Sequence, residues 1–209
     1  MPQARLGIGG TASYAAGRLA AILPGVRYHR YRLIAVPLSG MPSMPRGYTV
    51  VTAENFQLDG RIDANAAIMA YRRAQEADAL AAVHKDEIVG VTWLTARPFA
   101  EDEVRALWVP PDGMAWDTGM WVRPDRRLSR AFSALWAGTA DWLRQRGLHG
   151  SASRIADYNL GSLAPHSRMD ARSLGTVTFA GVGGLQVATR GCPRFTWAGV
   201  TRIETGARS

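Results

Sequence analysis

The sequence contains few residues of the kinds that form cross-links and metal sites. Cys192 is the single cysteine, which excludes an intramolecular disulfide and any metal site built from several cysteines. The four histidines have no spacing typical of a zinc site. We therefore expect no metal, and nothing in the cysteine content indicates an oxidising compartment. The cytoplasm is the location that we expect.

A long apolar segment is also missing. Arg5 and Arg18 interrupt the short apolar runs of residues 1–25, so we expect neither a signal peptide nor a membrane-spanning helix in this region. There is no internal repeat and no low-complexity block. With 209 residues, 47% of them hydrophobic and 20% charged, the chain can bury the core of one folded domain.

Lysine is nearly absent as well. Lys85 is the one lysine, so the net charge of +8 comes almost entirely from arginine. The planar guanidinium group pairs with phosphate and carboxylate through parallel hydrogen bonds. The charge is therefore compatible with a phosphorylated cofactor, an acidic carrier protein, an anionic lipid surface or nucleic acid. Arginines spread over a solvated surface would give the same total, so the charge alone selects no partner.

Residues 1–46 are predicted to form an N-terminal extension that packs on the rest of the chain. The pattern indicates a helix over 13–23 and a strand over 28–36, which Pro37 ends. We expect this strand to lie at the edge of a sheet with its charged side chains outward. A basic and aromatic patch for nucleic acid, around Tyr28, is the alternative interpretation.

Residues 47–190 show a regular succession of strands and helices, and residues 191–209 are predicted to be a C-terminal tail. Pro165 lacks a backbone N–H group and is favoured near the start of a helix, so we expect the helix that contains it to begin at Ser162 rather than Asn159. The predicted elements are a strand over 48–52, a helix over 62–77, a hairpin of strands 80–83 and 88–94, a strand over 115–122, a helix over 127–146, a strand over 150–155, a short helix over 162–169, and a hairpin of strands 177–180 and 185–189.

The turn after the strand over 115–122 carries the first recognisable motif. Val122, Pro124 and Arg127 match in spacing a Val-x-Pro-x-x-Arg/Gln-x-x-Gly-x-Gly/Ala run. This motif and the order of elements resemble the GNAT N-acetyltransferase superfamily. The resemblance implies an α+β, GNAT-like acyl-CoA N-acyltransferase fold, with a mixed, mostly antiparallel twisted sheet flanked by helices. Arg130 and Phe132 stand where the family has glycines, so arginine side chains would replace part of the backbone contact with the cofactor pyrophosphate.

A second motif follows the strand over 150–155. Asn159, Ser162 and His166 have the spacing of the asparagine, the small residue and the tyrosine that the family carries here. The resemblance implies acetyl-CoA or another acyl-CoA as co-substrate, with no metal. The implied cofactor-binding residues are Met120, Trp121, Val122, Arg126, Arg127, Leu128, Ser129, Arg130, Asn159 and Ser162, with backbone N–H groups of the strand near Met120 to Val122 as donors to the thioester carbonyl.

The chemistry of amide formation suggests catalytic roles. A thiolate leaving group needs a proton, and His166 occupies the position of the family tyrosine, so it is the candidate acid. An incoming ammonium must lose a proton, for which Asp117 is the first candidate base, followed by Glu103 and Glu101. The spacing of Ser162, His166 and Asp170 does not predict a hydrolase triad, because successive helical turns rarely give that geometry and no nucleophile elbow is present.

Seven tryptophans are many for a chain of this length. Four of them, near the expected acceptor side, would line an apolar pocket or pack in the core: Trp93, Trp108, Trp116 and Trp121. The sequence therefore predicts an N-acyltransferase that moves an acyl group from a CoA thioester to an amine, on a small molecule or peptide, through a ternary complex. The alternatives are an enzyme of the N-acyl amino acid or autoinducer synthase type with an acyl-carrier protein as donor, and a non-catalytic basic binding module. A homodimer is left open.

Overall fold

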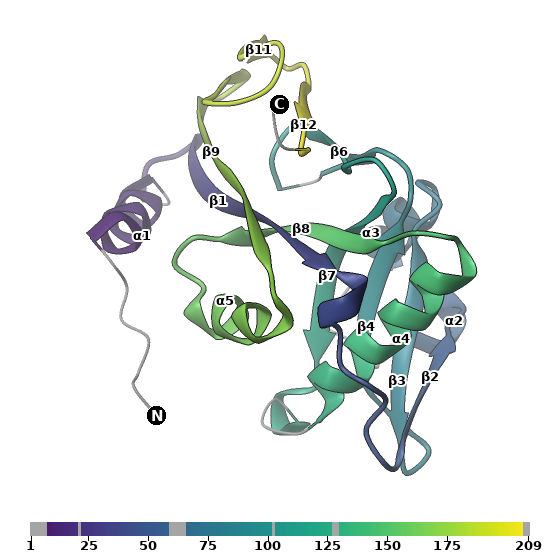
Figure 1. The fold of residues 1–209 in the computed structure, drawn as a ribbon. Coiled ribbons are helices and arrows are strands. Elements are labelled where there is room, and N and C mark those ends of the chain that lie inside the picture. The colour runs from purple at the N-terminus through teal and green to yellow at the C-terminus, as the bar shows by residue number, and fades with distance from the viewer. Residues whose placement is uncertain (1–7, 21, 59–65, 102, 127–129, 207–209) are drawn as a thin grey trace.

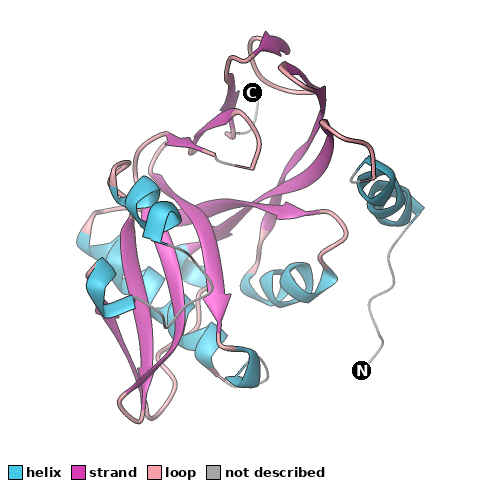
Figure 2. Cartoon of the chain, turned by 180° about the vertical axis from the view of Figure 1, so that it is seen from behind, coloured by secondary structure: helices cyan, strands magenta, loops and turns pink. Residues whose placement is uncertain are grey.

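The computed structural model describes residues 8–20, 22–58, 66–101, 103–126 and 130–206. In this part of the chain, nine strands form one mixed, mostly antiparallel sheet in the order β11-β10-β9-β1-β8-β7-β4-β3-β2, and three more form a small sheet in the order β12-β6-β5 (Figure 1). Helices flank the main sheet (Figure 2). The α+β class expected from the sequence is confirmed.

The elements have the following bounds. The strands are β1 Val26–Pro37, β2 Tyr48–Thr52, β3 Asp78–His84, β4 Glu87–Thr95, β5 Phe99–Ala100, β6 Ala106–Val109, β7 Met114–Val122, β8 Gly150–Ala156, β9 Arg172–Val182, β10 Leu185–Ala188, β11 Phe195–Trp197 and β12 Thr201–Glu204. The α-helices are α1 Ile8–Ala20, α2 Asn55–Leu58, α3 Ala66–Arg73, α4 Ala131–Gln145 and α5 Leu160–His166. Single 3₁₀ turns are η1 Leu38–Gly40, η2 Pro124–Arg126 and η3 Ser167–Met169.

The main sheet consists of two halves that meet at one parallel pair of strands. β8 remains antiparallel to β1 along its whole length, from Gly150 to Ala156. β7 remains antiparallel to β4 as far as Val122. Between the halves, residues Met114 to Asp117 of β7 pair with residues Gly150 to Ser153 of β8. No further residues of these two described strands pair with each other. The sheet therefore opens after Asp117.

Helix α4 covers one face of β2, β3 and β4 and crosses in front of them in Figure 1. Its apolar stripe includes Leu135 and Leu143, both fully buried. A Cβ atom on Gly138 would overlap the side chain of Val50 in β2, so glycine sets how closely the helix approaches the sheet. Helix α5 and η3 lie beside α4, where Trp136 and Met169 share a small cluster with Val36 of β1.

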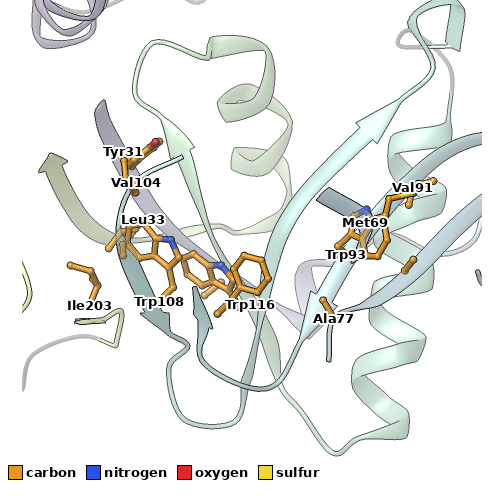
Figure 3. Close-up of a cluster of buried hydrophobic side chains, with 14 of the residues drawn as sticks. Tyr31, Leu33, Met69, Ala77, Val91, Trp93, Val104, Trp108, Trp116 and Ile203 are labelled. Carbon is orange, nitrogen blue, oxygen red and sulfur yellow. The ribbon is translucent and has the colours of Figure 1, made fainter. Parts of the chain in front are cut away.

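The other face of the sheet is covered by α3, by the small sheet and by a cluster of large aromatic side chains. The rings of Trp108 and Trp116 stack with centroids 5.3 Å apart, and both side chains have no exposed surface (Figure 3). Ile203 of β12 packs in the same cluster. Each such ring removes roughly 150–250 Å² from water, which makes this cluster a large contribution to stability. Of the two alternatives for the tryptophans, packing in the core holds for Trp93, Trp108 and Trp116, because all three side chains are buried there.

Most of the elements expected between residues 48 and 189 are present. The tight turn between β3 and β4 places Lys85 and Asp86 at φ values of 52° and 63°, as a two-residue hairpin turn requires. Helix α3 ends at Arg73, earlier than the predicted residue 77, because Glu76 has a left-handed φ of 56°. Its expected start at 62 lies outside the described residues. Helix α1 ends at Ala20 rather than 23.

The expectation that residues 28–36 form an edge strand is wrong. β1 lies between β8 and β9. The first five residues of β1 are half-buried, whereas residues 33–36 are buried on both faces, as an interior strand requires. Within the expected C-terminal tail, β11 pairs with β10 and β12 pairs with β6. Among the helices in the described part of the chain, none is both long and apolar enough to cross a membrane.

We predict that Gly138→Ala lowers the free energy of unfolding by about 1–3 kcal/mol, the usual cost of overpacking, although alanine is the better helix former by about 1 kcal/mol. The control is Gly17→Ala in α1, where the nearest atom to an added Cβ is the carbonyl oxygen of Tyr28 at 3.9 Å. This control should not destabilise the protein, and Val50→Ala should partly restore the Gly138→Ala variant. Equal denaturation midpoints for the two alanine variants would contradict this packing.

Candidate active site

A cleft lies in the gap between the two halves of the sheet. Its volume is about 1050 Å³. Small-molecule sites usually measure about 300–1,000 Å³, so the cleft can hold a large ligand. One wall is the stretch of β7 from 117 to 122, and the other walls come from β1, β8, α4 and the α5 region.

The backbone of β7 has an unpaired edge inside this cleft. Arg123 donates its N–H to the carbonyl of Val89 at 3.0 Å, and alternate residues of an antiparallel strand bond to the same neighbour. Trp121, which is opposite Val91, therefore faces β4. Met120 and Val122 direct their N–H and C=O groups to the other side, where β8 no longer pairs. The predicted backbone donors thus lie on the wall of the cleft.

Asp117 lies at the point where the two halves separate. The pairing of β4 with β7 shifts between Trp93 and Leu94, so Thr118 is an extra residue in β7 and forms a bulge. The Oδ1 atom of Asp117 accepts the N–H of Gly119 at 2.9 Å and lies 3.4 Å from the hydroxyl of Thr92. Burial raises the pKa of Asp117 to about 6, although these hydrogen bonds and the charge of Arg72 act in the opposite direction. The side chain is ionised above that pH.

His166 is held at the end of α5 against aromatic rings. Its ring makes edge contacts with Phe132 and Trp136 of α4, and burial lowers the pKa of His166. The Nδ1 atom lies 2.5 Å from the carbonyl oxygen of Ser162, which can only accept a hydrogen bond, so Nδ1 carries the proton. The neutral ring therefore has Nε2 as its acceptor. The partner of Nδ1 is a backbone oxygen and not the Ser162 hydroxyl, as expected if no triad is present.

The start of α5 differs from the prediction. The helix begins at Leu160, with Asn159 as its N-terminal cap, rather than at Ser162. The Oδ1 atom of Asn159 accepts the N–H of Ser162 at 3.1 Å, which satisfies a backbone donor that the first helical turn leaves free. This cap outweighs the tendency of Pro165 to sit at a helix start. Asn159 and His166 therefore occupy the same short helix.

A network of charged side chains forms the end of the cleft near β1. Glu103 accepts the hydroxyl of Tyr31 at 2.6 Å and lies 3.3 Å from the guanidinium of Arg154. Arg154 also pairs with the buried Glu101, and its guanidinium stacks over the ring of Tyr31. Burial would lower the pKa of Arg154, but the two carboxylates raise it, so the group stays charged. The Glu103 side chain is 48% exposed and faces solvent from this fixed position.

His29 completes this network. Its Nδ1 atom lies 3.7 Å from Oε1 of Glu103, and its ring stacks on Tyr31. Burial lowers the pKa of His29 more than the neighbouring Glu103 raises it, so the imidazole is neutral at pH 7. Next to it, Arg30 pairs with the buried carboxylate of Asp157 at 3.5 Å.

The turn between β7 and α4 holds the expected phosphate-binding residues. Arg123 is engaged by Glu87 and Asp125, at 3.0 and 2.7 Å. Arg126 lies in η2, 3.5 Å from Asp125, and Arg130 directly precedes α4 without a side-chain cap hydrogen bond. Both arginines lie beyond the residues that line the cleft. Arg127, Leu128 and Ser129 fall outside the described residues.

The structure brings most of the predicted site residues together. Eight of them line the one cleft: Glu103, Asp117, Met120, Trp121, Val122, Asn159, Ser162 and His166. Sequence analysis did not identify His29, Tyr31 and Arg154 as site residues, because they reach the cleft from strands whose pairing no local pattern indicates. The one available signal was the mixture of aromatic and basic side chains in residues 28–32. The described residues contain no cluster of three or more His, Cys, Asp or Glu side chains that could hold a metal ion.

Comparisons with known proteins identify a fold rather than a close relative. No family model matches the chain. No curated protein matches it either. Among solved structures, a conserved protein of unknown function from Staphylococcus epidermidis matches with a TM-score of 0.55 and 10% identity, over 81% of this chain and 66% of that one. A Drosophila protein matches with a TM-score of 0.51 and 9% identity, over 85% and 58%.

A GCN5-related N-acetyltransferase from Kribbella flavida also matches, with a TM-score of 0.46 and 15% identity, over 77% of this chain and 61% of that one. The chain thus spans about two thirds or less of the length of these three proteins. Its topology combines an antiparallel half sheet with the parallel pair of β7 and β8, which opens after Asp117. Helix α4 follows β7, and the capped short helix α5 follows β8. The chain has an α+β fold with a mixed, mostly antiparallel sheet flanked by helices, and GNAT acetyltransferases are among the solved structures that it resembles.

Proposed function

We propose that the chain is an N-acyltransferase that moves an acyl group from a CoA thioester directly to an amine. The observation that carries this proposal is the cleft lined by the unpaired edge of β7 and by α5. A ligand with amide groups can add to such an edge as a strand does, through hydrogen bonds to the backbone. Met120 and Val122 supply these groups.

The residues present fit an acyl-CoA co-substrate. The pantetheine amides would lie along β7, with Asn159 and Ser162 on the opposite wall. The phosphates would meet Arg126 and Arg130 near the N-terminus of α4, where the helix dipole favours negative charge. The long arginine side chains replace glycine backbone contacts in this arrangement. In this arrangement the acyl group, acetyl or longer, would lie in the cleft near Trp121 and Phe132.

The side chains of the cleft can move the two protons that amide formation requires. An acyl thioester supplies an electrophilic carbonyl and a thiolate leaving group. Asp117, ionised above a pKa of about 6, accepts the proton that converts the ammonium of the acceptor to a free amine. His166, neutral with its proton on Nδ1, takes the second amine proton at Nε2 and returns it to the sulfur. The acid is therefore formed during the reaction.

The charged network near β1 suits the acceptor. Glu103 presents a half-exposed carboxylate that Tyr31 and Arg154 hold in place, and Glu101 offsets the charge of Arg154. A cationic amine that enters from this end meets a negative group before it reaches Asp117. Glu103 is thus proposed as a binding group for the acceptor, and as the second candidate base.

We predict that acyl-CoA at 100 times its dissociation constant adds about 2.7 kcal/mol to the free energy of unfolding, or roughly 5–10 °C in melting temperature for a chain of this size. Arg126→Gln should weaken CoA binding about tenfold, because charged hydrogen bonds to phosphate are lost. It should not affect an acyl-pantetheine thioester without phosphates. The matched control is Arg144→Gln, an exposed arginine of α4 that also pairs with an aspartate.

A stable complex with an acyl-carrier protein, without any response to acyl-CoA, would favour the carrier-protein alternative. No response to either donor would favour a non-catalytic module.

We predict that Asp117→Asn is inactive with amines and changes how stability depends on pH. Because the folded-state pKa is above the ordinary value of 3.8, the folded protein holds a proton that the unfolded chain releases, so this group costs stability as pH rises from about 4 to 6. The wild type should lose roughly 3 kcal/mol of stability over this range through Asp117 alone. Asp117→Asn should gain that amount relative to the wild type between pH 4 and pH 7.5 in chemical denaturation. A constant difference between the two proteins at all pH values would show that the side chain is not buried as described.

We predict that His166→Phe reduces turnover by about 10²–10⁴, the usual contribution of a positioned acid or base, while acyl-CoA affinity stays within about twofold. Phenylalanine preserves the contacts with Phe132 and Trp136, which separates a chemical role from packing. The neighbouring Ser167→Ala, which removes an exposed hydroxyl, is the control. Unchanged turnover in His166→Phe would remove this residue from the mechanism.

A further inference from the structure

The positive charge of the chain is concentrated in one part of the fold. Residues 8–37 and 171–203 contain eight arginines and no aspartate or glutamate, and the net charge of the whole chain is +8. The two segments lie together, because β1 pairs with β9, β9 with β10 and β10 with β11, and α1 packs on β1. We call residues 8–37 and 171–203 the basic arm. The rest of the chain has no net charge.

The end of the basic arm carries large apolar side chains in solvent. Their exposed fractions are high, which is unusual for neighbouring residues of this size. Six of them are Trp197 (77%), Ile22 (75%), Phe195 (68%), Val182 (59%), Leu23 (57%) and Leu185 (38%). We call these six residues the arm tip.

Backbone contacts show that the arm tip is one surface. Gly183, in the β9–β10 turn, donates its N–H to the carbonyl of Gly25, which follows Ile22 and Leu23, at 3.0 Å. Leu185 is opposite Trp197 in the sheet, and the N–H of Ala198 bonds to the carbonyl of Gly184 at 2.8 Å. β11 lies at the top of the molecule and α1 at its side, and both lie away from α4 and β2 to β4 (Figures 1 and 2).

One face of the terminal hairpin carries all of its exposed apolar groups. Paired residues in a sheet point to the same side, so Val182, Leu185 and Trp197 share a face, and Phe195, two positions before Trp197, lies on that face too. The intervening Thr196 is buried on the other face, where Gln186 bonds to Arg105. The apolar face has no covering element among the described residues.

We propose that the arm tip docks on an anionic lipid surface. The argument is charge complementarity around an apolar centre: Arg18 and Arg194 are exposed beside the tip, and no carboxylate lies in the arm sequence to repel lipid phosphates. Tryptophan is favoured at the headgroup level, and aliphatic side chains enter the acyl boundary. Nucleic acid fits less well, because Ile22, Leu23 and Val182 have no flat face on which a base can stack.

This docking would leave the cleft between β7 and β8 open, because no residue of the arm tip lines it. The surface and the candidate active site are therefore independent features. An acyltransferase held in this way would meet amines or acyl donors that lie at a membrane. The proposal about the arm tip does not depend on that activity.

The test is co-sedimentation of the full chain with vesicles of pure phosphatidylcholine and with vesicles of equal parts phosphatidylcholine and phosphatidylglycerol. We expect sedimentation with the anionic vesicles only, and its loss at high salt. The Ile22→Ser, Trp197→Ser double variant should lose binding, and Arg18→Gln and Arg194→Gln should each weaken it about fivefold. All these side chains are exposed, so the melting temperatures should stay those of the wild type.

The control variants are Val51→Ser and Arg144→Gln, which change exposed groups of β2 and α4 away from the arm. They should bind as the wild type does. Absence of sedimentation with anionic vesicles would overturn the proposal. A second result would also overturn it: the Ile22→Ser, Trp197→Ser variant binds anionic vesicles fully, and the protein binds a DNA duplex as tightly as it binds vesicles. That result would identify a general polyanion-binding surface instead.

Discussion

The separation of β7 from β8 after Asp117 is the constraint on which the rest of the site depends. A strand inside a sheet can pair with two neighbours. β8 pairs with β1 on one edge along its whole length, and β7 pairs with β4 on one edge. The bulge at Thr118 turns β7 away from β8, and the carboxylate of Asp117 holds that bulge through the N–H of Gly119. An open backbone edge and a cleft follow from this one change of direction.

The ionisable groups of the cleft are arranged so that each has a defined state. Burial keeps His166 and His29 neutral and raises the pKa of Asp117 to about 6. By contrast, Arg154 stays charged because two carboxylates surround it. The cleft can therefore accept protons at neutral pH while it presents negative charge at the end near β1. This combination suits chemistry on an amine.

Local patterns predicted the parts of the fold that local physics decides. The stripe of Leu135 and Leu143 in α4 and the hairpin turn at Lys85 and Asp86 follow from helical spacing and turn chemistry, and both are found. The central position of β1 was not predicted, because its partners are more than a hundred residues away in the sequence. The same long-range pairing brings Tyr31 and Arg154 into the site, whereas Met120 and Val122 follow one motif on one strand.

Amide hydrogen exchange with and without acyl-CoA tests the central claim most directly. Trp121 bonds to β4 and should exchange slowly in both states, whereas Met120 and Val122 face the open cleft. The account predicts that acyl-CoA slows exchange at Met120 and Val122 and leaves Trp121 unchanged. Protection elsewhere in the chain, with no change at Met120 and Val122, would contradict the assignment of the β7 edge as the acyl-donor site.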